Sequence, residues 1–135
     1  ELRELVIDLD LGHSVNFIGP VNRDDRIEIY DAHKFFILPS KNESFGLVIG
    51  EALARGCVSF VSDRTPWTLD EDIPNLIMVQ PDQNILYDTI KGYIEKDSQY
   101  SAIDAITSQH TIARRYSWID RMKHLNILYF ENENE

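Results

Sequence analysis

Two glutamates, Glu43 and Glu51, stand on either side of the start of an amphipathic segment, with seven residues between them. Helical spacing of apolar residues predicts a helix from about Gly46 to Arg55, with Ser44 as its N-cap. The first N–H groups of a helix have no partner within the helix, and the helix dipole favours an anion there. A phosphate bound at these amides, with carboxylates nearby to accept hydrogen bonds from hydroxyl groups, is therefore the chemistry this spacing favours.

The helix geometry relates the second glutamate to such a phosphate. Glu51 follows Leu47 by one turn, about 6 Å along the axis, and its side chain leans back toward the N-terminus. A phosphate at the amides of residues 46–48 would leave Glu51 within reach of an attached ribose. Gly50 destabilises a helix by roughly 1 kcal/mol relative to alanine, which a ligand groove would explain. The core face is expected to carry Phe45, Ile49, Ala52 and Leu53. The alternative is that both glutamates are solvated surface carboxylates.

Short apolar runs and helical patterns alternate along the chain and must position these residues. We expect strands at residues 15–18, 35–38, 58–61 and 76–79. We expect helices near residues 2–9, 23–31 with Asn22 as N-cap, 46–55 ended by Gly56, 82–96, 98–113 and 117–130, followed by a polar tail at 131–135. Alternation of this kind predicts an α/β fold, a Rossmann-like parallel sheet with flanking helices. Ligands of such sheets bind beyond the carboxyl ends of the strands, where the Glu43 segment falls.

Composition limits the classes of function. The chain has 135 residues, enough for one domain, and a net charge of −10 from 13 basic and 23 acidic residues. So acidic a surface repels phosphate backbones and anionic headgroups, which argues against nucleic acid and electrostatic membrane binding. No apolar stretch approaches the roughly 20 residues of a membrane-spanning helix. The single cysteine, Cys57, excludes an internal disulfide.

The segment as a whole, Pro39-Ser40…Glu43-Ser44-Phe45-Gly46…Glu51-Ala52-Leu53-Ala54…Gly56, resembles the Glu-x7-Glu signature of family 4 (group 1) retaining glycosyltransferases. The resemblance covers about residues 1–130 and is to the C-terminal donor-binding domain of the GT-B fold. It includes Val15 to Val21, Ser62 to Trp67 and Tyr116-Ser117-Trp118. The family's glycine-rich stretch after the strand near 58–62 is replaced here by Thr65-Pro66-Trp67, and a common proline by Val58.

The resemblance assigns roles residue by residue. Glu43, as the first glutamate, would be the catalytic-site residue that holds hydroxyls of the donor sugar, and Glu51 would bond the ribose hydroxyls. The amides that contact sugar and diphosphate would be those of Ser44, Phe45, Gly46, Leu47 and Val48. The loop Gly19-Pro20-Val21 would lie near the base. The helix N-terminus would stabilise the leaving diphosphate, so neither a metal ion nor another cofactor is expected.

By the same resemblance, the protein would be a retaining hexosyltransferase that passes a sugar from a nucleotide donor to a glycan or glycolipid acceptor, in polysaccharide or glycoconjugate synthesis. The resemblance implies a cytoplasmic location, with a peripheral position at the inner membrane face as the alternative for the full-length protein. Residues 1–130 would be a partial donor domain that lacks its first strand, and the acceptor would bind a missing N-terminal domain. The fragment alone is expected to be inactive.

Other features have weaker functional interpretations. Asp8 and Asp10 mimic a metal-binding Asp-x-Asp motif but are expected on a solvated helix face. Cys57 is expected to be a small packed residue, and the four histidines are too scattered for a metal site. Asp63 and Trp67 follow a strand and are candidates to line the ligand cleft. The alternative is that Asp63 or Thr65 caps a helix. The alternative function is a flavodoxin- or receiver-like signalling module. Such a module needs an aspartate at the end of its central strand, where the strand at 35–38 is followed instead by Pro39-Ser40. A third possible function is that of a GT-B nucleotide-sugar epimerase.

Overall fold

The computed structural model describes residues 1–69, 72–95 and 101–116. Its elements, in chain order, are α1 (Leu2–Asp8), α2 (Arg23–Ala32), β1 (Phe35–Leu38), α3 (Leu47–Ala54), β2 (Val58–Ser62), the 3-10 helix η1 (Pro66–Leu69), β3 (Leu76–Val79), α4 (Gln83–Glu95) and α5 (Ala102–Tyr116). The expected helix at 117–130 and the expected tail at 131–135 lie outside the described residues.

The three strands form one parallel sheet in the order β1-β2-β3. Phe35 pairs with Val58 at one end of β1, and Ser62 pairs with Val79 at the other end of the sheet. All five residues of β2 are buried, which is why its sequence is apolar or small throughout rather than alternating. The predicted α/β class with a parallel, Rossmann-like sheet is confirmed.

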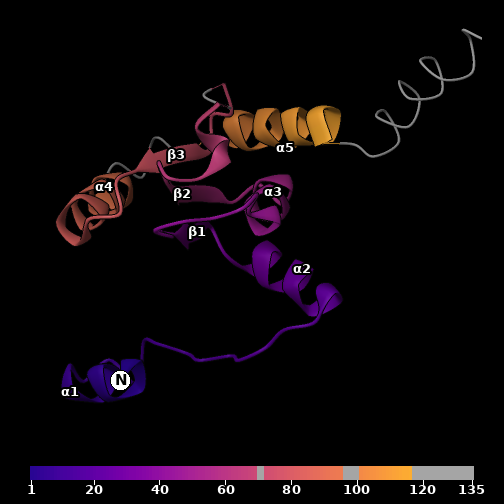
Figure 1. Cartoon of the computed structure of the whole chain (residues 1–135). Helices are drawn as coiled ribbons and strands as arrows, with labels where there is room; N and C mark the ends of the chain where they lie inside the picture. Colours follow the sequence, from indigo (N-terminus) through magenta and orange to yellow (C-terminus); the bar gives the residue numbers. More distant parts are fainter. Residues whose placement is uncertain (70–71, 96–100, 117–135) are drawn as a thin grey trace, which may run out of the picture.

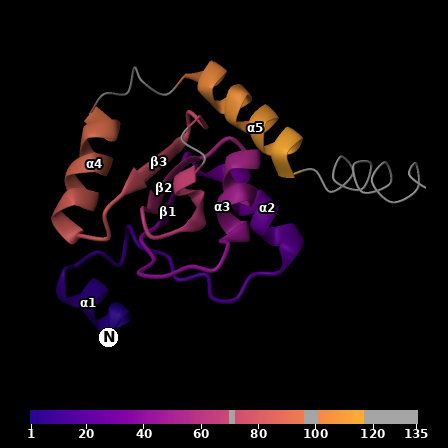
Figure 2. The ribbon, with the colours of Figure 1, turned by 45° about the horizontal axis from the view of Figure 1, so that its top comes forward.

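Helices cover both faces of the sheet, as Figures 1 and 2 show, with α4 on one face and α3 and α5 on the other. Successive residues of β2 alternate between the two layers. Val58 and Phe60 pack with α4 residues, whereas Val61 packs with Ile49 and Leu53 of α3 and with α5. The centre of the core therefore lies between β2 and α3, the helix that follows the Glu43 segment.

Polar side chains start three of the helices as capping rules predict. The Asn22 side chain accepts a hydrogen bond from the Asp25 amide at 2.9 Å, which confirms the predicted start of α2. Asp82 and Ser101 do the same for α4 and α5. α5 begins four residues later than expected and extends to Tyr116. Gly56, at φ +87°, follows the end of α3 as predicted.

The prediction of a strand at residues 15–18 is wrong. These residues form no strand, and β1 pairs only with β2 within the described residues. Val15, Phe17 and Ile18 stay 37–57% exposed, so too little apolar surface is buried to offset the ordering of a four-residue strand. Figure 1 shows this segment as an extended connection between α2 and α1, which is itself set apart from the sheet.

Candidate functional site

The Glu43 segment leaves the carboxyl end of β1 and turns into α3 at Gly46, not at Ser44. Gly46 is the N-cap residue, with left-handed backbone angles of φ 68° and ψ 56°, and no side chain caps the helix. A Cβ atom at residue 46 would lie 2.7 Å from Cδ1 of Ile49, so the position has neither the torsional freedom nor the space for a side chain. The prediction that Ser44 is the N-cap is therefore wrong, because a glycine turn replaces side-chain capping.

Glu43 folds back onto its own loop. Its Oε1 accepts a hydrogen bond from the Ser44 amide at 3.1 Å, and its Cγ lies next to the space above Gly46. The side chain is half-buried, whereas Ser44 is exposed. A carboxylate oxygen thus lies on one of the loop amides that the sequence analysis assigned to an anion.

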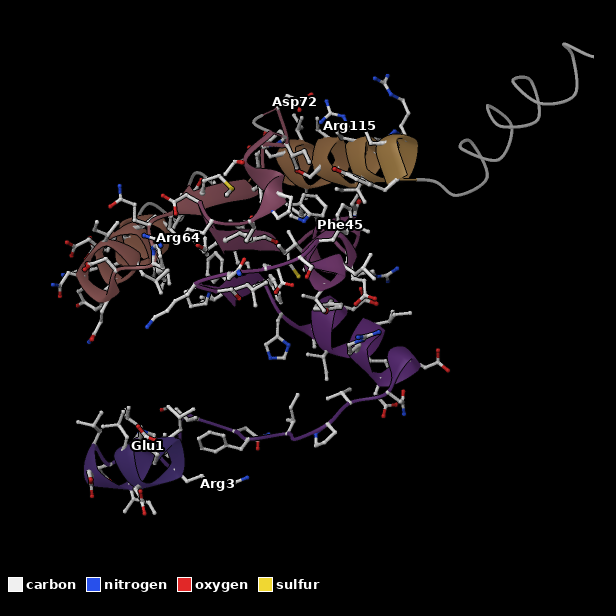
Figure 3. The ribbon with its side chains drawn as sticks, viewed as in Figure 1. Glu1, Arg3, Phe45, Arg64, Asp72 and Arg115 are labelled. Carbon is white, nitrogen blue, oxygen red and sulfur yellow. The ribbon has the colours of Figure 1, made fainter. Side chains whose placement is uncertain are left out.

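The other residues of the loop divide between core and surface. Phe45 was expected on the core face, but it precedes α3 and its side chain is 43% exposed. One side of its ring still contacts Trp67 and Tyr116, at centroid distances of 5.8 and 5.9 Å, and Figure 3 shows it between α3 and α5. Leu47 is 71% exposed, and Val48 is half-buried. The expected core residues Ile49, Ala52 and Leu53 are fully buried.

Glu51 contacts two side chains of α2. Arg26 Nη2 donates to its Oε1 and the Tyr30 hydroxyl donates to its Oε2, both at 3.3 Å. Burial and then the negative charge of Glu51 raise the pKa of Tyr30, so the phenol remains a proton donor to the carboxylate. A hollow of about 170 Å³ adjoins this group and is lined by Glu51, Tyr30, Ile27, Ala54 and Arg55. Glu51 is thus held in one orientation at the edge of a hollow.

Gly50 does not open a groove for a ligand, as its presence in the helix had suggested. A Cβ atom at residue 50 would lie 3.2 Å from Cη2 and 3.4 Å from Cζ2 of Trp67, so the indole occupies this space. Trp67 is 2% exposed and therefore does not line an open cleft, and Asp63 is exposed. The prediction of a groove at Gly50 is wrong because a side chain from the loop after β2 fills it.

The Gly19-Pro20-Val21 loop lies on the α2 side of the site. Gly19 has a φ of +71°, a backbone conformation that favours glycine, and Val21 and Ile18 line an open cavity of about 490 Å³. The other lining residues come mostly from α2 and β1, among them Arg26 and Tyr30. The structure therefore connects Val21 to Glu51 through two α2 side chains that touch both the cavity and the carboxylate.

The weaker candidates behave mostly as structural residues. Cys57 is buried, its thiol donates to the carbonyl oxygens of Tyr30 and His33, and burial raises the pKa of the thiol. Asp8 and Asp10 are exposed. Within the described ranges, no three His, Cys, Asp or Glu side chains are grouped as a metal site would require. The described helices are all too short or too polar to cross a membrane.

Sequence reasoning missed Arg26 and Tyr30 and gave Trp67 a different role. Arg26 and Tyr30 lie four residues apart on α2 and so share a helix face, a spacing that could have indicated a common partner. Trp67 was considered only as a cleft residue. Its signal was Gly50 itself, because a glycine inside a helix often marks the close approach of a bulky neighbour.

Comparison with known proteins identifies the family. The chain is 29% identical over 131 residues to the D-inositol 3-phosphate glycosyltransferase of Corynebacterium kroppenstedtii, covering 96% of this chain and 29% of that protein. It is 33% identical over 131 residues to the enzyme of the same name from Corynebacterium urealyticum, covering 95% of this chain and 30% of that protein. The chain thus spans about a third of the length of these relatives.

A solved structure shows the same fold. Sucrose-phosphate synthase from Thermosynechococcus elongatus superimposes with a TM-score of 0.81 at 23% identity, over 96% of this chain and 33% of that one. The family model described as glycosyl transferases group 1 matches residues 1–103. These matches do not favour the signalling-module alternative. The chain belongs to the glycosyl transferases group 1 family.

Proposed function

We propose that this chain is the nucleotide-sugar-binding, C-terminal domain of a retaining GT-B glycosyltransferase. The observation that carries the proposal is the pair of glutamates placed around the N-terminus of α3, at the carboxyl end of β1. Glu43 lies at the loop amides, and Glu51 lies one turn into the helix beside a hollow. This is where α/β sheets bind ligands, and a helix N-terminus favours an anion.

The contacts around each glutamate suit the binding of a different part of a nucleotide sugar. The Ser44 amide donates to Glu43 Oε1, so an oxygen of the nucleotide sugar would bind this N–H in exchange for the carboxylate. The Glu51 carboxylate has a hydrogen-bond donor on each oxygen, and each oxygen retains a lone pair for a ribose hydroxyl. The amides of residues 44–48 would hold the diphosphate and the nearby sugar.

The base would lie toward Val21. The 490 Å³ cavity beside Val21 is lined chiefly by apolar and aromatic residues, with Arg26 and Tyr30 on the side of Glu51. An apolar cavity suits the flat face of a base, while backbone groups of the Gly19-Pro20-Val21 loop could reach its polar edge. The order base, ribose, diphosphate, sugar would then run from Val21 past Glu51 to Glu43.

In this proposal Glu43 holds hydroxyl groups of the donor hexose while the bond between the anomeric carbon and the diphosphate breaks. The amides at the start of α3 stabilise the charge that develops on the leaving diphosphate. Transfer retains the anomeric configuration and uses no metal ion or other cofactor. A glycan or glycolipid acceptor would bind a separate N-terminal domain, in polysaccharide or glycoconjugate synthesis at the cytoplasmic face of the membrane. Because the corynebacterial relatives are named for D-inositol 3-phosphate, that compound is a further acceptor to test.

The test is binding of nucleoside diphosphates to the full-length protein, measured calorimetrically with UDP, GDP and ADP. We expect one of them to bind, and Glu51→Gln to weaken it by about tenfold, as expected for lost hydrogen bonds to a charged group. The same substitution should weaken binding of the 2′-deoxy analogue of that nucleotide much less, because the analogue lacks one of the hydroxyls that would form a hydrogen bond with Glu51.

A matched control is Glu28→Gln, which removes the same charge from an exposed position on α2. It should leave the affinity unchanged, whereas Glu43→Gln should lower sugar transfer while nucleotide binding persists. If UDP, GDP and ADP all fail to bind, the donor-site proposal is wrong. If one binds but Glu51→Gln and Glu28→Gln behave alike, the ribose role of Glu51 is wrong.

A further inference from the structure

Trp67 is fixed in the core by one short hydrogen bond and two ring contacts. Its indole Nε1–H donates to the backbone carbonyl oxygen of Phe45 at 2.6 Å. Its rings lie 5.8 Å from the Phe45 ring and 5.1 Å from the Tyr116 ring, centroid to centroid. The residue comes from η1, after β2, so it joins the loop of one strand to the loop of the neighbouring strand.

The hydrogen bond determines the orientation of a peptide group in the Glu43 loop. The peptide between Phe45 and Gly46 is planar and trans, so its C=O and N–H point in opposite directions. With the carbonyl oxygen directed at the buried indole, the Gly46 N–H is directed away from it. A rotation of this peptide would break the indole bond and leave a buried donor without a partner, which is strongly unfavourable.

A second contact fixes the indole against α3. The benzene edge of Trp67 lies over Gly50, one turn beyond Gly46, and a methyl group added there would lie 3.2 Å from Cη2, close enough to push the ring aside. The side chain therefore touches both the loop before the helix and the second turn of the helix. It holds the Phe45–Gly46 peptide and α3 in a fixed relation to each other.

We propose that Trp67 is a positioning residue that holds the Phe45–Gly46 peptide with its N–H directed toward the donor diphosphate. The proposal rests on the donor site described above and adds to it a residue with no direct contact to the ligand. The family that this chain resembles has a glycine-rich stretch at the position of Thr65-Pro66-Trp67. This chain therefore fixes the Glu43 loop with an aromatic side chain from its buried side.

The experiment is Trp67→Phe in the full-length protein, which keeps an aromatic ring and removes the N–H donor. Affinities are measured by calorimetry for UDP, GDP and ADP, and by ligand-observed NMR for uridine, guanosine and adenosine. We expect the diphosphate that binds the native protein to bind the variant about tenfold more weakly, the effect of one hydrogen bond to a charged group. The matching nucleoside, which has no phosphate, should bind both proteins equally.

Thermal unfolding shows whether the Trp67→Phe protein folds, and a second variant tests the proposal if it does not. Gly50→Ala keeps the indole N–H but displaces the ring, and we expect the same selective loss of diphosphate affinity. Gly92→Ala in α4, where a Cβ would meet nothing within 4 Å, is the control and should change neither affinity. Equal losses for diphosphate and nucleoside, or no loss for either, would overturn the positioning role. Failure of the native protein to bind any diphosphate would instead overturn the donor site, and the role of Trp67 with it.

Discussion

At Gly46, the addition of a single methyl group should measurably lower the free energy of unfolding. Its φ of +68° lies in the left-handed region, where a residue with a Cβ costs about 1–2 kcal/mol more than glycine. Alanine also makes the unfolded chain less flexible, which recovers about 0.4–1 kcal/mol. The added Cβ would lie 2.7 Å from Cδ1 of Ile49 and 3.2 Å from Cγ of Glu43, and both side chains must move.

These contributions predict that Gly46→Ala lowers the free energy of unfolding by about 1–2.5 kcal/mol, because the repacking of Ile49 adds about 1 kcal/mol, the lower end of overpacking costs. Urea denaturation followed by circular dichroism measures the change. The matched control is Gly92→Ala, the same substitution inside α4 without a positive φ and with open space around it. There the loss of a helix glycine should stabilise the protein by about 0.5–1 kcal/mol.

The two variants should therefore differ by roughly 2 kcal/mol with opposite signs. A Gly46→Ala protein within about 0.5 kcal/mol of the native one would refute the argument, because neither the torsional cost nor the crowding would then exist. An equal destabilisation by both variants would also refute it, since the cause would lie in alanine itself.

Three further predictions follow from the described contacts. The Arg55 guanidinium holds the pKa of Asp31 below its ordinary 3.8, so the stabilising effect of this pair is present above that value and is lost as the pH falls through the lower pKa of the folded state. Asp31→Asn should thus lower the urea midpoint at pH 7, and the difference should shrink as the pH is lowered below 3.8; a constant difference would contradict this. Since burial raises the pKa of Cys57, a thiol reagent at pH 8 should label the native protein far more slowly than the protein in urea, and equal rates would show that the thiol is accessible. Tyr30→Phe removes one of the two donors to Glu51 and should narrow the difference in affinity between a ribonucleoside diphosphate and its 2′-deoxy analogue by about threefold in titration calorimetry, whereas an unchanged ratio would mean that Tyr30 does not orient Glu51.

Local patterns predicted the sheet and most helices because the relevant physics lies within a few residues. The runs at 35–38 and 76–79 are apolar throughout, the run at 58–61 is apolar apart from Ser59, and all three form parallel strands, of which β2 is fully buried. Asn22 caps α2 through its own side chain. The run at 15–18 is also mostly apolar but forms no strand. A strand must pair with a neighbouring strand, and the sequence of the run alone does not determine whether such a neighbour is present.

The candidate site was predicted in outline and not in its contacts. Placing Glu43 and Glu51 around a helix start required only the 3.6-residue period and the position of a preceding strand. The error over Gly50 has a different cause, since Trp67 reaches it from beyond β2 and only the folded arrangement brings residues 50 and 67 together. The contacts of Arg26 and Tyr30 with Glu51 likewise depend on how α2 and α3 pack.

The shortness of α3 has a consequence for how this protein can change. Of its eight residues, Ile49, Ala52 and Leu53 are fully buried, Gly50 lies against the indole of Trp67, and Glu51 is a proposed site residue. These five form the unbroken run 49–53. A helix with a free solvent face would tolerate substitution in a periodic pattern, whereas this run should show a continuous block of intolerance in a saturation mutagenesis screen. Under the proposed function, a change of donor preference would therefore have to arise in the surrounding loops, which can vary without disturbing the core.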